Sequence, residues 1–128
     1  MLEIGIKNRK STEVTLQNTA VSVGSGTLEV FATPAMCALM EATAAESVET
    51  LVDEGCTTVG TRLNITHVSA TPVGMSVHCE SELTAIEGRK LMFKVTAFDE
   101  KGIIGEGEHD RFIINAEKFM TKTNEKNN

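Results

Sequence analysis

Glu41 and His67 are the side chains of this sequence whose types and predicted positions fit acid/base chemistry. Glu41 comes one turn after Cys37, on the flank of the apolar face of a predicted helix. A carboxylate in that position must be paired, hydrated in a pocket or protonated. His67 alternates with Leu63 and Ile65, so in a strand it would point towards the face that the helix covers. If the two side chains meet there, they have the right types for general acid/base catalysis near neutral pH.

Each candidate residue also has a structural interpretation, and the residue pattern leaves both readings open. Glu41 can be an edge residue that reaches solvent, and His67 can be a buried histidine with a purely structural role. Thr33 precedes a proline and is expected to be the N-cap of the helix, which by itself explains a threonine there. His78 alternates with solvent-facing acids and is not expected in a site, and His109 remains ambiguous.

A long helix and an antiparallel sheet are the elements expected to position these residues. The helix is predicted to run from Thr33 to Glu54 and to end at Gly55. Its apolar face includes Met36 and Met40. Strands are predicted at Glu13 to Gln17, Thr57 to Val68, Met75 to Ile86, Leu91 to Phe98 and Ile103 to Ile114.

Short turns join the last four predicted strands, which indicates an antiparallel meander. The fold class is therefore expected to be α+β, with one helix along the concave face of one curled sheet. The length of 128 residues predicts one domain over residues 1–128, and residues 120–128 are expected to form a frayed tail.

Composition excludes several classes of function. The net charge is −6, there is no Trp or Tyr, and no basic run accompanies the five Phe, so a nucleic-acid partner is not expected. Apolar stretches are too short to cross a membrane and the N-terminus has no signal-peptide pattern, so a cytoplasmic location is expected. The three Cys lack a CxxC pair, which favours reduced thiols over disulfides or a zinc site. Motifs for nucleotide hydrolysis, dinucleotide binding, serine hydrolase and zincin chemistry are absent.

Four segments of the sequence resemble the fluoroacetyl-CoA thioesterase family of hotdog-fold proteins. They are VFATPAMCALMEATA (Val30 to Ala44), VGTRLNITHVSATPVGMSV (Val59 to Val77), EGRKLMFKVTAFDEKGIIGEGEHDRFII (Glu87 to Ile114) and EKF (Glu117 to Phe119). The resemblance implies a hotdog fold, a homodimer or larger homo-oligomer with active sites at the subunit interface, and hydrolysis of an acyl-CoA thioester.

The same resemblance assigns roles to residues. The functional Thr, Glu and His of the family fall on Thr33, Glu41 and His67, a Gly near the acyl group falls on Gly60, and an Arg of the last strand falls on Arg111. In the hypothesis that follows, Glu41 activates a water or attacks the thioester, His67 polarises the reacting group, and Thr33 orients Glu41 or the water. No metal or redox cofactor is required.

The segment before the helix departs from the family pattern. The enzyme that gives the family its name has a longer, aromatic-rich segment that covers the acyl pocket, whereas Leu16 to Glu29 contains no aromatic residue. With Met36 and Met40 as flexible apolar candidates near Glu41, we expect a wider acyl site that takes short or medium acyl-CoAs.

Two other functions are compatible with this fold. One is a non-catalytic acyl-CoA or small-acid binding protein, because a fold does not fix a function. The other is a hotdog hydratase or dehydratase, which should place a histidine on the helix; the predicted helix has none.

Overall fold

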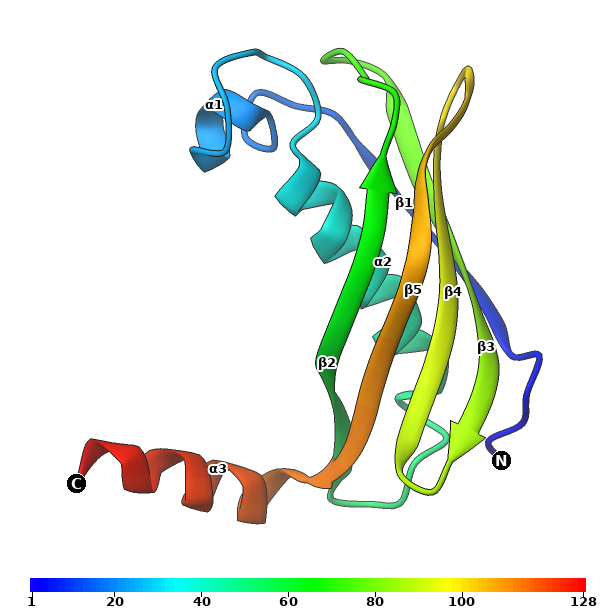
Figure 1. Ribbon diagram of the computed structural model, residues 1–128, viewed down its shortest axis with the longest axis vertical. Helices are drawn as coiled ribbons and strands as arrows, with labels where there is room; N and C mark the ends of the chain where they lie inside the picture. The colour runs from blue at the N-terminus through cyan, green and yellow to red at the C-terminus, as the bar shows by residue number, and fades with distance from the viewer.

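A computed structural model describes residues 1–128 as one long helix wrapped by a five-stranded antiparallel sheet (Figure 1). In chain order the elements are β1 (Lys7–Glu13), α1 (Ala20–Val23), α2 (Thr33–Val48), β2 (Cys56–His67), β3 (Ser76–Glu87), β4 (Lys90–Asp99), β5 (Gly102–Asn115), α3 (Ala116–Asn124) and the 3-10 helix η1 (Glu125–Asn127). The predicted helix-then-meander order and the α+β class are confirmed.

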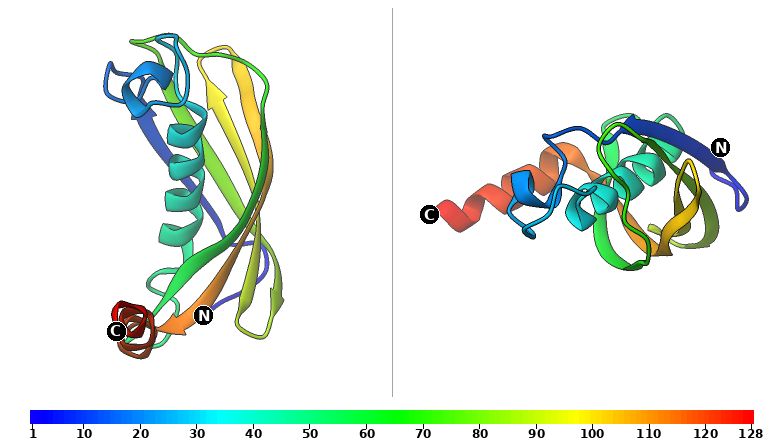
Figure 2. Two further views of the ribbon diagram at one scale, coloured as in Figure 1. Left: turned by 60° about the vertical axis from the view of Figure 1, so that its left-hand side comes forward. Right: turned by 90° about the horizontal axis from the view of Figure 1, so that it is seen from above.

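The sheet has the strand order β1-β3-β4-β5-β2, so β1 and β2 are its two edges. Its curvature wraps it around α2, which lies along the concave face (Figure 2). Met36, Met40, Ala44 and Val48 of α2 are completely buried and pack with apolar residues of β3 and β4. The predicted apolar face of the helix is thereby confirmed at its centre.

The long helix is shorter than predicted, because it ends at Val48 and not at Glu54. The amide of Leu51 bonds to the carbonyl of Val48, a tight turn that begins to bring the chain back to the sheet. Gly55 then takes a φ of 82°, a conformation that other residues rarely adopt, directly before β2 begins. The predicted stop at Gly55 thus marks the end of this turn.

The first strand also differs from the prediction, since it occupies Lys7–Glu13 instead of Glu13 to Gln17. Its residues show no apolar alternation, because β1 is an edge strand with mostly exposed side chains. Antiparallel pairing with β3, in which Glu13 lies opposite Ser76, fixes its position. After β1 the side chain of Asn18 accepts from the amide of Thr15 and forms a turn there.

The C-terminal residues, expected as a frayed tail, form α3 and η1 instead. The side chain of Asn115 caps α3 by accepting from the amide of Lys118 at 3.0 Å. No residue of α3 is buried, and the helix leaves the body of the molecule beyond the foot of β2 and β5 (Figure 1). No helix of the protein is long and apolar enough to span a membrane.

Candidate active site

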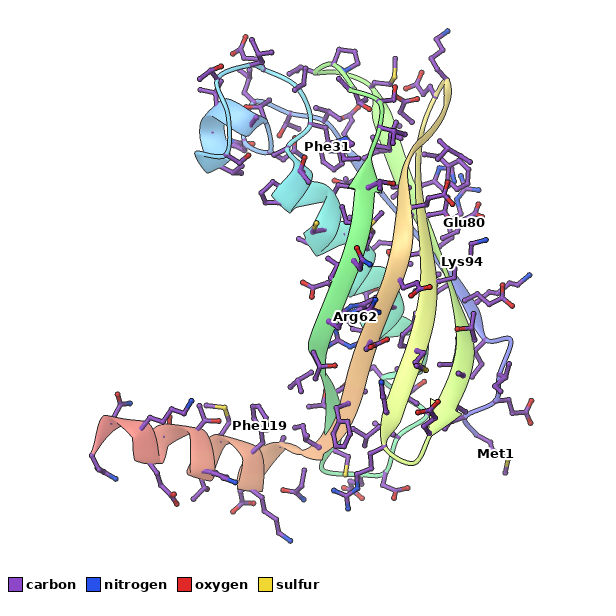
Figure 3. All side chains as sticks on the ribbon, viewed as in Figure 1. Met1, Phe31, Arg62, Glu80, Lys94 and Phe119 are labelled. Carbon is purple, nitrogen blue, oxygen red and sulfur yellow. The ribbon has the colours of Figure 1, made fainter.

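Two hollows lie along the side of α2 that faces the open edge of β2. The first has a volume of about 320 Å³ and lies where α2 begins and β2 ends. Its lining includes Thr33, His67, Phe31, Ser69 and Ala70. Phe31, which marks this end of the molecule in Figure 3, is almost completely buried.

Thr33 and His67 are in direct contact in the first hollow. The hydroxyl Oγ1 of Thr33 lies 2.7 Å from Nδ1 of the His67 ring, and Nε2 of the same ring is buried with no hydrogen-bond partner. Burial lowers the pKa of His67 below its ordinary value of 6.5, although the nearby backbone of Ser69 acts in the opposite direction. Burial therefore favours a neutral imidazole, and its Nε2 has no hydrogen-bond partner within the chain.

Local structure explains why the Thr33 hydroxyl is free for this contact. Ala32 is the N-cap of α2 and makes no side-chain capping bond, so Thr33 is the first helical residue and not the predicted N-cap. Pro34 follows in the first turn, where its missing N–H is not needed. The threonine side chain is thus used across the hollow, towards β2.

The second hollow, of about 430 Å³, surrounds Glu41. It lies further along α2, and its lining includes Ala45, Thr58, Gly60 and Arg111. Glu41 is half-buried, as the helical projection predicted, and makes no hydrogen bond or ion pair within the chain. A Cβ atom built on Gly60 would lie 3.0 Å from Oε2 of Glu41 and 3.3 Å from Nη1 of Arg111. A larger residue at position 60 would require these side-chain ends to move by a few tenths of an ångström.

Arg111 is held rigidly beside Glu41. Its Nε donates to the Thr58 hydroxyl at 2.8 Å and its Nη2 to the Thr58 carbonyl at 2.9 Å. Its Nη1 lies 3.1 Å from Nε2 of His109. The guanidinium is nearly buried, and burial lowers its pKa while the charges of Glu41 and Glu49 act to raise it. Arg111 therefore contributes a fixed positive charge next to the Glu41 carboxylate.

His109 completes this network from beneath. Because a guanidinium can only donate, Nε2 of His109 must accept, and Nδ1 must carry the proton that it donates to the Arg62 carbonyl at 2.8 Å. The ring is fully buried, and burial lowers the pKa of His109. His109 is thus a neutral histidine that holds Arg111 in place, a role that neighbouring acids in the sequence did not indicate.

A bulge in β2 decides which of its residues face α2. The strand register shifts between Gly60 and Arg62. Before the bulge, Thr58 is buried and Gly60 approaches Glu41; after it, Leu63 and His67 are on the more buried side. Simple alternation predicts the second half of the strand and misses Thr58.

Within one chain, the Glu41 carboxylate and the Thr33–His67 pair belong to separate hollows with no lining residue in common. Thr33 and Glu41 are eight residues apart on α2, which is about 12 Å at 1.5 Å per residue. The single subunit therefore brings Thr33 to His67 and Glu41 to Gly60 and Arg111, and no hydrogen bond joins the two groups.

The remaining candidates lie in the protein interior or beside the site. Met36 and Met40 are 0% exposed and belong to the core, and neither lines the two hollows. All three cysteines are free thiols, as expected. Burial and the charge of Glu41 raise the pKa of Cys37, and burial raises the pKa of Cys79 to about 11, so neither is an activated nucleophile.

Comparison with known proteins gives the same family as the sequence motifs. The family model described as fluoroacetyl-CoA-specific thioesterase matches residues 14–117. A fluoroacetyl-CoA thioesterase of Streptantibioticus cattleyicolor is 40% identical over 98 residues, which are 77% of this chain and 70% of that protein.

Solved structures agree. A structure of the fluoroacetyl-CoA thioesterase FlK has a TM-score of 0.93 and 32% identity, with 98% of each chain covered. Because nearly the whole of that chain has a counterpart here, this protein does not lack a long segment of it. A hot-dog-like protein from Thermanaerovibrio acidaminovorans, 22% identical with 98% of this chain and 93% of that chain covered, has a TM-score of 0.90 and shares the fold. The chain therefore belongs to the fluoroacetyl-CoA thioesterase family of hotdog-fold thioester hydrolases.

Proposed function

We propose that this protein hydrolyses short or medium acyl-CoA thioesters at a site built by two subunits. The observation that carries the proposal is the contact between Thr33 and His67, which leaves Nε2 of the ring buried and free beside the start of α2. Family membership supplies the reaction class, and the unbonded Glu41 carboxylate supplies the base or nucleophile.

In the proposed reaction, Glu41 either removes a proton from the attacking water or attacks the thioester carbonyl itself to form a transient anhydride. Arg111 keeps a positive charge beside that carboxylate. His67, oriented by Thr33, hydrogen-bonds through Nε2 to the reacting group. The carbonyl oxygen becomes negatively charged, and the first amides of α2 lack acceptors within the helix and favour such a charge. The thiolate of coenzyme A then leaves without needing strong acid assistance.

The separation of the two hollows supports an interfacial site. Strand β2 is an open edge that contains one permanently charged residue, Arg62, whereas the other edge, β1, carries Lys7, Arg9 and Lys10. Charged edges resist pairing and uncharged edges invite it. We therefore place a second copy along β2, related by a two-fold axis that pairs the two β2 strands antiparallel.

Such an axis places the beginning of one β2 next to the end of the other. The Glu41 hollow of each subunit then faces the Thr33–His67 hollow of its partner, and one water or acyl group can lie between them. A homodimer, or a larger assembly of such dimers, follows. The chemistry needs no metal or redox cofactor, and a cytoplasmic location fits three reduced thiols.

Steady-state release of CoA thiol from a panel of acyl-CoAs tests the activity. Glu41→Gln should lower kcat by at least about a hundredfold, the low end of what one positioned acid/base group contributes. Glu46→Gln is the matched control, because Glu46 lies on the same helix but pairs with Lys10 at the surface. His67→Ala should act like Glu41→Gln, with His78→Ala as its control; His78 stacks on Phe98 away from the site.

Full activity of a folded Glu41→Gln protein would rule out the proposed role of the carboxylate. Retained acyl-CoA binding without measurable turnover in the wild type would favour a binding protein. Light scattering at micromolar concentration should give a dimer or larger, and an active monomer would contradict the interfacial site.

A further inference from the structure

Helix α3 has an apolar side that nothing in its own subunit covers. Phe119 is 39% and Met120 is 49% exposed, and their side chains are about 100° apart around the helix. Lys118 and Lys122 lie one turn apart on the neighbouring side, and Lys126 follows in η1. An amphipathic helix with this surface is suited to docking on a partner.

The position of α3 points to the partner. Figures 1 and 2 show α3 extending beyond the edge strand β2, on the same side of the molecule as α1 but at the opposite end. Nine residues give about 14 Å of helix, and neighbouring strands are about 4.8 Å apart, so α3 reaches some three strand widths past the edge. Phe119, labelled in Figure 3, lies on this projecting arm.

The two-fold axis proposed above brings opposite ends of the two subunits together. Each α3 then lies beside the partner's α1, at the end of the molecule where Thr33 and His67 line their hollow. Residues around α1 have apolar side chains open to solvent, among them Val21 and Leu28, at 50% and 67% exposure. In the proposed dimer, Phe119 and Met120 of the partner can pack against them.

The distribution of charge around the site indicates a role for the lysines of α3 beside the partner's α1. Between Ser11 and Thr61 the sequence has seven acidic residues and no Lys, Arg or His. This segment includes α1, α2 and the first half of β2, which surround the site. The guanidinium of Arg111 is nearly buried and already bonded to Thr58 and His109. The site's own surface therefore offers little to the phosphates of coenzyme A.

We propose that α3 of one subunit is the nucleotide-binding element of its partner's active site, with Lys118 and Lys122 contacting the phosphates of the bound acyl-CoA. The inference rests on the proposed thioesterase function and dimer. It accounts for an exposed helix with two lysines and one glutamate at the end of an acidic chain, and for its projection beyond the β2 edge.

The test compares acyl-CoA with the same acyl thioester of pantetheine, which lacks every phosphate. Lys118→Glu combined with Lys122→Glu should raise KM for acyl-CoA and lower its kcat/KM by at least about tenfold, with kcat within about twofold. Hydrolysis of acyl-pantetheine should not change. Lys101→Glu is the control. Lys101 is an exposed lysine in the β4–β5 turn, near the end of β2 that carries His67, and its reversal should leave the hydrolysis of both substrates unaffected.

A mixed dimer tests whether α3 acts on the neighbouring site. One subunit carries the two lysine reversals with native His67, and the other carries His67→Ala with native lysines. The only working His67 then faces the native α3 of the other subunit, so the KM for acyl-CoA should equal that of the wild type. If the KM of the mixed dimer instead equals that of the dimer in which both subunits carry the lysine reversals, α3 serves the site of its own subunit.

Other outcomes also overturn the inference. They are an unchanged kcat/KM for acyl-CoA in the lysine variant, an equal loss with acyl-CoA and acyl-pantetheine, or a larger effect from Lys101→Glu. Failure of the proposed function looks different, because the wild type would then hydrolyse neither substrate.

Discussion

The hydroxyl of Thr33 lies 2.7 Å from Nδ1 of His67, although the two residues are 34 positions apart in the chain. This contact joins the first turn of α2 to the last residue of β2. It sets the direction of the imidazole, whose Nε2 is buried without a hydrogen-bond partner. Catalysis should therefore depend on the hydroxyl and not only on the ring.

Thr33→Val keeps the shape of the side chain but removes this hydrogen bond. We expect kcat to fall about tenfold, the equivalent of about 1.4 kcal/mol, which is in the range of one hydrogen bond. Thr33→Ser retains the hydroxyl and should stay within about threefold of the wild type. Steady-state kinetics of both variants check this, and full activity of the valine variant would show that the hydroxyl is dispensable.

Gly60→Ala should reduce activity more than stability. Its Cβ would lie 3.0 Å from Oε2 of Glu41 and 3.2 Å from Cε1 of His109. His109 is held by hydrogen bonds, whereas the Glu41 carboxylate is free and would have to move. We expect kcat to fall at least about tenfold with a change in Tm of only a few degrees, since about 1 kcal/mol corresponds to a few degrees in a protein of this size.

Gly107→Ala is the substitution to compare with Gly60→Ala. Its Cβ would collide with the backbone carbonyl of Asn64, a contact that only a shift of the strands can relieve. Thermal unfolding should therefore show a large loss of stability for this variant. Equal effects of the two substitutions on Tm would mean that Gly60 is needed by the fold and not by the site.

Stability should decrease as the pH falls below about 6.5, because the folded protein keeps the buried His109 neutral. The pKa of His109 is lowered in the folded state, so below the ordinary value of 6.5 the unfolded chain binds a proton that the folded protein does not. The stability that the neutral His109 adds is fully present above pH 6.5 and is lost as the pH falls towards the lowered pKa of His109. Its slope is at most about 1.4 kcal/mol per pH unit for one histidine.

Urea unfolding at a series of pH values measures this slope. His109→Gln should have a shallower dependence of the unfolding free energy on pH in that window, even if the variant is less stable overall. An unchanged slope would assign the pH dependence to other groups.

The acyl site should accept several short or medium acyl-CoAs within roughly tenfold in kcat/KM, a spread of about 1.4 kcal/mol. No aromatic residue between Leu16 and Glu29 is present to fit tightly around one small acyl group. Phe31 does line the first hollow, but it is almost completely buried and fixed there. Fluoroacetyl-CoA and acetyl-CoA should therefore be hydrolysed with similar efficiency.

Competition between these two substrates measures the selectivity. A ratio of a thousand or more would show that discrimination does not require aromatic residues in that segment.

The sequence by itself determined the order of the long helix and the four strands after it, and most of the candidate residues. Apolar spacing along α2 and alternation in the later strands reflect burial on one face, which acts at every position of a regular element. Glu41 and His67 stood out because each broke that pattern. The resemblance in motifs added Gly60 and Arg111.

Only the tertiary structure decided how these residues are grouped. The bulge after Gly60 reverses the alternation of β2, and pairing across the sheet places His109 under Arg111, effects that depend on contacts between distant segments. Likewise, Thr33 contacts His67 because Ala32 takes the N-cap position. Glu41 remains two helical turns away from Thr33, since a helix rises about 1.5 Å per residue and cannot bring both to one point within a single chain.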